Sequence, residues 1–169
     1  MAFEYETNLD AVIQVLKDKN TTTATPYLSL SLSTGQIDSF NIVNLDPDLV
    51  PWRVDRLPAI FVRVSNKEDI FEGVGQTGTG GTRVAKRGVV FYDVIGIAPK
   101  YGMHTDPQNL MDDIYRLARN VEAAFRQEFS LSNTALWCNP QRTSFGIAVV
   151  DETWTKSFSL ELQATYLFK

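Results

Sequence analysis

The stretch that decides the fold is Val-Val-Phe-Tyr-Asp-Val-Ile-Gly-Ile-Ala, at residues 89–98. Its side chains are apolar or small at every position except Asp93. A strand with one face in water alternates apolar and polar residues, whereas a strand covered on both faces is apolar throughout. The sequence therefore predicts a central strand over residues 89–98, with other parts of the protein packed on both of its faces.

A period of two residues indicates the other strands. Residues 58–64 place Ile60, Val62 and Val64 on one face, as a strand with one core-facing side requires. Strict alternation of Leu and Ser predicts a half-buried strand at residues 28–32. Extended segments are also predicted at residues 37–45, 145–150 and 158–168, with a polar turn at 151–153.

In two segments the apolar residues recur at the spacing of an amphipathic helix. The first begins at Asn8, which can act as the N-cap, and ends at Lys19. The second has Asp106 as its N-cap and Pro107 in its first turn, and it ends near Phe129. Its apolar stripe consists of Leu110, Ile114, Leu117, Val121 and Phe125.

The order of these elements is helix, several strands, long helix and two strands. Consecutive strands without helices between them favour antiparallel hairpins. We therefore expect an α+β fold, with a mostly antiparallel sheet, two helices packed on one face and a long glycine-rich β-hairpin. The 169 residues match the usual size of one domain, so we expect a single domain over residues 1–169, with a flexible loop at about 73–88.

The predicted hairpin carries an unusual density of glycine, followed by a small basic cluster. The glycines are Gly73, Gly75, Gly78, Gly80 and Gly81, and the cluster is Arg83, Lys86 and Arg87. Residues 73–78 match the dinucleotide pattern GxGxxG, but that motif requires a helix after it, and residues 79–82 are Thr-Gly-Gly-Thr. A hairpin tip is therefore favoured, and a nucleotide-binding enzyme that uses residues 73–82 is the alternative.

Composition excludes several classes of function. A single Cys and a single His exclude disulfide frameworks within the chain and zinc sites that need several such ligands. His104, Cys138 and Asn139 supply the residue types of a thiol-protease triad, but neither His104 nor Cys138 has a recognisable nucleophile context. We therefore expect no catalytic residue, no metal and no cofactor.

Charge and hydropathy limit the partners and the location. Sixteen Lys and Arg against twenty Asp and Glu give a net charge of −4, which argues against binding dominated by DNA phosphates. The N-terminus is acidic where a signal peptide begins with basic residues, and no apolar run reaches the roughly 18–20 residues of a membrane span. We expect synthesis in the cytoplasm and no membrane partner.

The aromatic residues outside the predicted periodic stripes are candidates for interfaces. Trp52, Trp137 and Trp154 all fall in predicted loops, where aromatic side chains are typical anchors for partner proteins. Phe91 lies on the central strand, on the face opposite Tyr92. We therefore predict Trp52, Trp154 and Phe91 as interface residues, together with the glycines and the basic cluster of the hairpin.

The whole arrangement resembles the tail-terminator proteins of tailed bacteriophages and the related head–tail joining proteins. An amino-terminal helix leads to Leu-Pro-Ala-Ile-Phe-Val at residues 57–62, and the glycine-rich hairpin and the apolar strand follow. Asp-Asp-Ile-Tyr at residues 112–115 stands near the start of the long helix, and a strand pair ends the chain. The resemblance covers most of the chain.

The resemblance implies a non-enzymatic virion protein that forms a ring, commonly a hexamer. Such a ring caps the head-proximal end of the tail tube and joins it to the head connector or neck proteins, while DNA passes through without specific binding. The hairpin at 73–88 and the outward face of the strand at 89–98 would then contact neighbouring subunits or the tail tube protein. Another neck or baseplate ring adaptor is an alternative that the sequence leaves open.

Overall fold

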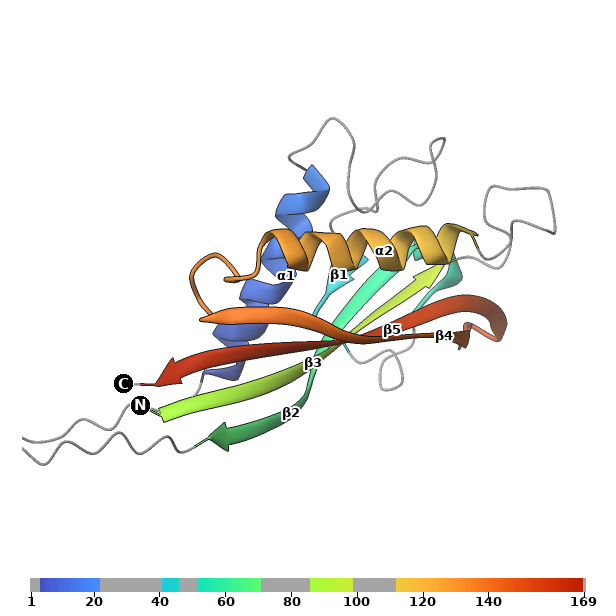
Figure 1. The fold of residues 1–169 in the computed structure, drawn as a ribbon. Helices are drawn as coiled ribbons and strands as arrows, with labels where there is room; N and C mark the ends of the chain where they lie inside the picture. Colours follow the sequence, from blue (N-terminus) through green and yellow to red (C-terminus); the bar gives the residue numbers. More distant parts are fainter. Residues whose placement is uncertain (1–3, 22–40, 46–51, 71–85, 99–111, 169) are drawn as a thin grey trace, which may run out of the picture.

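The protein is described here by a computed structural model, which covers residues 4–21, 41–45, 52–70, 86–98 and 112–168 (Figure 1). It has an α+β fold with two α-helices and one mixed five-stranded sheet. In chain order the elements are α1 (Tyr5–Thr21), β1 (Ile42–Val43), the 3-10 helix η2 (Val54–Arg56), β2 (Ala59–Ile70), β3 (Lys86–Ala98), α2 (Asp112–Gln127), β4 (Trp137–Val150) and β5 (Thr153–Phe168).

The strands lie side by side in the order β1-β2-β3-β5-β4. The β1 strand pairs in parallel with the start of β2, and every other pairing is antiparallel, as expected for most of the sheet. β3 lies in the middle and pairs along its length with β2 and β5, which confirms the predicted central strand. Its single charge within residues 89–98, Asp93, is opposite Arg63 of β2, and the two side chains form an ion pair of 3.0 Å.

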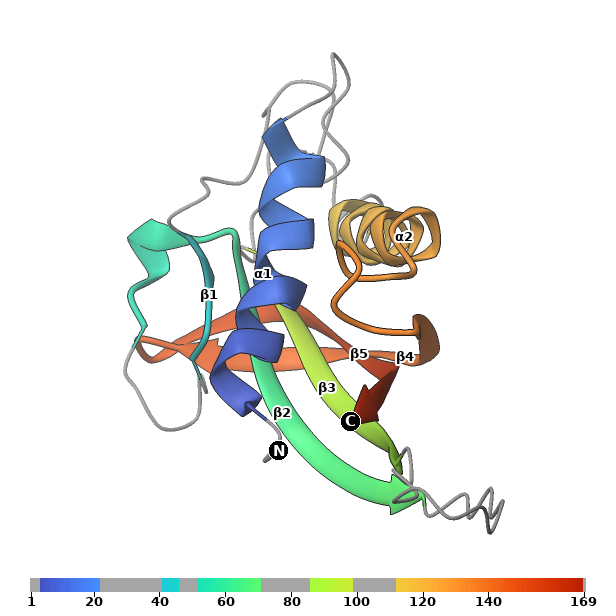
Figure 2. The same cartoon turned by 90° about the vertical axis from the view of Figure 1, so that its left-hand side faces the viewer.

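Both helices pack on the same face of the sheet (Figure 2). The apolar stripe of α2 is buried as predicted from Ile114 to Phe125, and it packs with Val90, Tyr92 and Val94 of β3 in the main core. Within that core the hydroxyl groups of Tyr92 and Tyr166 hydrogen-bond to each other at 2.7 Å, which satisfies two buried polar groups at once. Neither helix in the described ranges has the length and apolar character of a membrane span.

The opposite face of the sheet carries a second, smaller core. Ala59, Phe61 and Ile97 are buried there together with Val150 from the end of β4. The segment between β1 and β2 covers this part of the face through partly buried Leu45, Trp52 and Leu57. The central strand is therefore covered on both sides at this end, whereas Phe91 and Ile95 on the same face are only half-buried.

The β4–β5 hairpin extends past the end of β3. The last residue of β3, Ala98, pairs with Lys156, so residues 148–155 have no neighbour from β3. We call residues 148–155 the overhang. Because Val150 belongs to the smaller core, the overhang curls onto the open face of the sheet. The two residues at its tip, Asp151 and Glu152, have positive φ angles of 48° and 61°, as in a two-residue hairpin turn, so the predicted polar turn is confirmed.

Several predicted bounds are wrong. α1 begins at Tyr5, so Asn8 is not its N-cap: the Asn8 side-chain amide donates to the Glu4 carbonyl at 2.7 Å. The Glu4 carboxylate accepts a hydrogen bond from the Thr7 hydroxyl (3.2 Å) at the start of the helix. β4 begins at Trp137 and β5 at Thr153, earlier than predicted, because pairing with each other makes strands of polar stretches that have no periodicity of their own. Trp137 and Trp154 therefore lie in strands.

Other predictions fall outside the described residues. These are the strand at 28–32, the glycine-rich segment at 71–85 and the start of the long helix, with Asp106, Pro107 and Leu110. β2 and β3 pair as far as Ile70 and Arg87, so they are the two strands that the glycine-rich segment joins. The glycine-rich hairpin itself stays a prediction.

Gly96 is a position where a side chain cannot be accommodated. A Cβ atom there would overlap the ring of Phe158, the buried residue that pairs with Gly96 across β3 and β5. Overpacking of this kind costs about 1–3 kcal/mol. We expect Gly96→Ala to lower the free energy of unfolding by that amount, as measured by urea denaturation.

Gly146 provides the matched control, since it also lies within a strand. A Cβ atom at Gly146 would be 3.8 Å from the Ser157 hydroxyl, which is an ordinary contact. Gly146→Ala should therefore leave the free energy of unfolding within about 0.5 kcal/mol of the natural value. Equal losses in both variants would show that the contact with Phe158 is not what forbids a side chain at residue 96.

Candidate functional site

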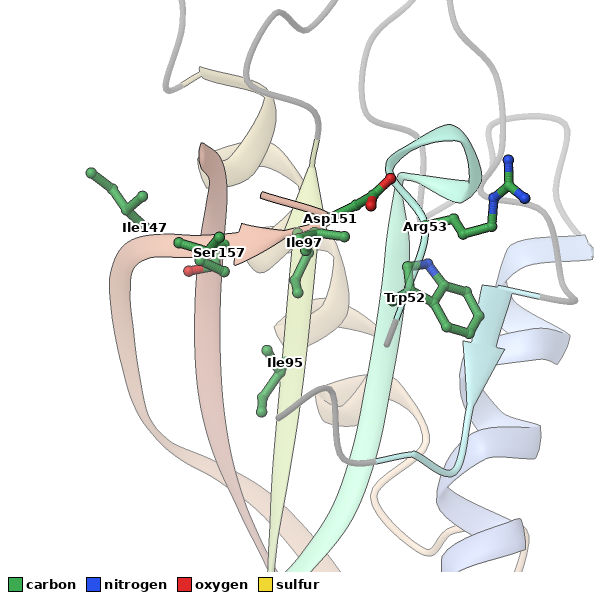
Figure 3. Close-up of a pocket in the computed structure, with 10 residues that line it drawn as sticks. Trp52, Arg53, Ile95, Ile97, Ile147, Asp151 and Ser157 are labelled. Atoms are coloured by element: carbon green, nitrogen blue, oxygen red, sulfur yellow. The ribbon is translucent and has the colours of Figure 1, made fainter. Parts of the chain in front are cut away.

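The open face of the sheet contains an apolar hollow of about 440 Å³. Ile95 and Ile97 of β3 form its floor, and Trp52 and the curled overhang form its walls (Figure 3). The complete lining is Trp52, Arg53, Ile95, Ile97, Ile147, Ala148, Val149, Val150, Asp151 and Ser157. Arg53 points away from the hollow and pairs with Asp55 at 3.0 Å, so its charge is directed to solvent.

Trp52 is fixed in place by aromatic and cationic neighbours. Its ring meets that of Phe61 edge-to-face, with centroids 5.1 Å apart, and the Arg56 guanidinium lies 5.8 Å from the Trp52 ring centroid. The indole Nε1 atom is buried and has no hydrogen-bond acceptor among the described residues.

The outer side of the β4–β5 hairpin is apolar and exposed. Trp154, Val149 and Ile147 have exposed fractions of 59%, 57% and 70%. Trp154 and Val149 are directly opposite each other in the ladder, so their side chains lie on the same side. Nearby, Tyr115 of α2 stacks edge-to-face on Phe145 with centroids 4.7 Å apart. Exposed apolar surface of this kind is typical of an interaction site.

The structure places some of the predicted interface residues and not others. Trp52 lines the hollow, and Trp154 lies on the outer side of the overhang. Phe91 is half-buried on the same sheet face as the hollow but does not line it. Arg87 is exposed near the start of β3. The remaining predicted residues have no described side chain: Gly73, Gly75, Gly78, Gly80, Gly81, Arg83 and Lys86.

Sequence reasoning missed three contributors to these surfaces. The sequence predicts Ile147 and Val149 only as strand residues, and Tyr115 only as part of the helix. The signal that could have found Ile147 and Val149 is the run from Thr143 to Val150, which contains no charge and no proline and ends at a polar turn. A strand without charged residues on either face has no clear solvent face.

The residues considered for a thiol-protease triad do not form a site among the described residues. Cys138 is buried, and its thiol points to the main-chain carbonyls of Phe125 and Glu128 at 4.0 and 3.7 Å. Burial and the nearby Glu128 carboxylate raise the pKa of Cys138 to about 12, opposite to what a nucleophile needs. His104 lies outside the described ranges, and within those ranges no cluster of three or more His, Cys, Asp or Glu could hold a metal ion.

No protein-family model matches the chain, and no curated protein matches its sequence. The surfaces described above are therefore the basis for the functional argument.

The raised pKa of Cys138 predicts an inert thiol in the folded protein. At neutral pH a rise from 9.0 to about 12 lowers the thiolate fraction roughly a thousandfold. We expect Ellman's reagent to label the native protein at least about 100-fold more slowly than the urea-unfolded chain. Fast labelling of the native protein at pH 7 would contradict the burial of this thiol.

The same shift makes stability depend on alkaline pH. A group whose pKa is higher in the folded state binds its proton more tightly there, so its contribution is complete below the pKa of the unfolded chain. Cys138 should therefore lower the free energy of unfolding as pH rises from about 9 toward 12. Cys138→Ala should weaken this dependence in urea titrations at several pH values, while the part due to Tyr92, whose pKa burial raises to about 12, should remain.

Proposed function

We propose that the protein is a non-enzymatic subunit of a homo-oligomeric ring, most similar in role to a bacteriophage tail terminator. In this role it is made in the host cytoplasm and becomes part of the virion, at the junction of tail and neck. Copies of the chain form a ring, commonly a hexamer, that caps the head-proximal end of the tail tube. The ring contacts the tail tube protein on one side and the head connector or neck proteins on the other.

The observation that carries this proposal is that one chain has both an apolar hollow and an apolar projection. The hollow lies on the open sheet face beside Trp52. The projection is the exposed Trp154, which does not line the hollow, whereas Val149 borders both surfaces. A hollow and a projecting aromatic side chain at different places on one molecule favour a heterologous contact, in which each copy binds the next. Such contacts close into a ring when the rotation between copies is a simple fraction of a turn.

The chemistry of the two surfaces supports this pairing. Trp154 is a large apolar side chain, of the kind that provides the anchor in many protein interfaces. The floor of the hollow, Ile95 and Ile97, and the ring of Trp52 at its wall provide apolar contact.

The net charge of −4 is compatible with DNA that passes through a ring without binding to it. The small basic cluster at Arg83, Lys86 and Arg87 would then contact acidic protein surfaces, with the glycine-rich segment reaching a neighbouring subunit or the tube. Another ring adaptor of the neck or baseplate would use the same surfaces. Immunogold labelling of virions separates these roles, because a terminator is found at the top of the tail.

Removing the projecting tryptophan tests the ring contact. We expect light scattering at high protein concentration, alone or with added cognate tail tubes, to show ring-sized oligomers of the natural protein. Trp154→Ala should weaken this assembly about 30-fold or more, since truncating an interface anchor costs about 2 kcal/mol or more.

Trp137→Ala is the matched control, because Trp137 is similarly exposed but lies at the other end of β4. It should leave assembly unchanged. Equal loss in both variants would show that the overhang has no special part. A natural protein that stays monomeric and also fails to bind tail tubes would contradict the proposal as a whole.

A screen of nucleotides tests the alternative of an enzyme that uses residues 73–82. A ligand that binds only the folded state at about 100 times its Kd stabilises that state by about 2.7 kcal/mol. We expect no shift in Tm with any common nucleotide or dinucleotide in thermal unfolding experiments. A saturable shift that disappears when residues 75–81 are deleted would favour the enzyme instead.

A further inference from the structure

The outer edge of β4 is an apolar strand edge without protection. In the described part of the chain β4 pairs only with β5, so its other side is an edge of the sheet. Residues 143–150 read Thr-Ser-Phe-Gly-Ile-Ala-Val-Val, with no charge and no proline. Phe145, Ile147 and Val149 are exposed along this edge, with Ile147 the most exposed at 70%. An edge of this composition is a template for pairing with another strand.

The turn at Asp151 and Glu152 determines which main-chain groups this edge offers. The residues that flank a two-residue turn, here Val150 and Thr153, form a hydrogen-bonded pair, and such pairs alternate with non-hydrogen-bonded pairs along the ladder. Counting back from Val150 places Val149, Ile147 and Phe145 in the non-hydrogen-bonded pairs. Their N–H and C=O groups therefore point outward, away from β5. The apolar side chains of the same three residues lie beside this edge, on one face of the sheet.

The other described edges are protected against such pairing. On β2, beyond the two residues that pair with β1, the edge has a bulge between Val64 and Asn66 and carries Lys67 and Glu68. The first half of β4 has Pro140, Arg142 and a bulge between them. Charges, prolines and bulges are the devices by which proteins prevent edge-to-edge association. Among the described edge strands they are missing from β1, which is only two residues long, and from residues 143–150 of β4.

We propose that a second copy of the chain pairs with this edge, β4 against β4 in antiparallel orientation, with the two-fold axis at Ile147. Ile147 then forms a hydrogen-bonded pair with its own counterpart, and Phe145 lies opposite Val149 of the second copy. Every outward-pointing apolar residue thus meets another apolar residue, and the two sheets become one continuous sheet.

Charge complementarity identifies a second copy as the partner. β4 ends at Val150, so in the register centred on Ile147 the exposed Arg142 of one copy lies beside the turn of the other, where Asp151 and Glu152 are both exposed. The same pairing occurs twice because of the two-fold symmetry. Registers centred on residue 146 or 148 pair fewer of the three apolar residues with one another. This contact is isologous, so it is different from the heterologous ring contact proposed above. It would protect the edge of β4 in protein that is not part of a ring.

A single cysteine tests this geometry directly. In a hydrogen-bonded antiparallel pair the Cα atoms are about 5.5 Å apart, within the range that a disulfide can bridge. We expect Ile147→Cys to form a covalent dimer under mild oxidation. The natural protein should not, because its one thiol, Cys138, is buried.

Ser144→Cys is the matched control. Residue 144 lies opposite residue 150 of the second copy in this register, so the two introduced thiols would be far apart and should cross-link at least about tenfold more slowly. Efficient cross-linking of the Ser144→Cys variant, or none of the Ile147→Cys variant, would overturn the proposal. If the Ile147→Cys variant forms rings but no cross-link between its 147 positions, the β4–β4 contact is wrong and the ring proposal stands. If it forms a cross-linked dimer but never a ring, the ring proposal is wrong and the β4–β4 contact stands.

A charge on the edge provides the second test. Ile147→Lys places two like charges opposite each other at the two-fold axis, and we expect it to raise the dimer Kd about tenfold or more in sedimentation equilibrium. Asn139→Lys introduces the same charge on β4 outside the paired stretch and should leave the Kd unchanged. Circular dichroism checks that both variants fold. A dimer whose Kd is insensitive to Ile147→Lys would overturn the proposal.

Discussion

β3 is held on both sides by long antiparallel ladders, to β2 on one side and β5 on the other, and the position of every other element depends on this. The helix-facing side chains of β3, among them Tyr92 and Val94, form the platform on which α1 and α2 pack. Its opposite side chains, Ile95 and Ile97, form the floor of the hollow. One strand thus supports the main core with one face and the candidate binding surface with the other, so that a change in its register would exchange the two sets of side chains.

The overhang gives the molecule its asymmetry. Where β3 ends, β4 and β5 continue, and no other described strand pairs with them there to keep them in the plane of the sheet. The hairpin curls until Val150 reaches the smaller core, which leaves an apolar outer side without a cover. The same bend therefore buries Val150 on the inner side of the hairpin and exposes Val149 and Trp154 on its outer side. The hollow and the projection are therefore two consequences of one structural feature.

The parts of the fold that the sequence predicts are those whose burial produces a period. The stripe of α2 and the two-sided apolar run of β3 are of this kind, and so is the alternation of Ile60 and Val62. The first half of β4 has no such period, because Asn139 and Arg142 are exposed and the segment is a strand only through its pairing with Gln163 and Glu161 of β5. The hollow could not be predicted from the sequence either, because the overhang forms one of its walls only by curling onto the sheet. The sequence singles out Trp52 as an aromatic residue in a loop. It does not predict which other residues line the hollow with Trp52.

The contact between Gly96 and Phe158 lies two residues from the point where β5 passes the end of β3. The direction in which the hairpin leaves the sheet is therefore determined in the interior of the protein, by how closely these two strands approach. In the proposed ring, changes at exposed positions such as Val149 and Trp154 would alter how tightly copies of the chain bind one another. Changes at Gly96 or Phe158 would alter the angle at which those copies meet. The strength of the proposed assembly and its curvature would thus depend on different residues, so that substitutions could change one without the other.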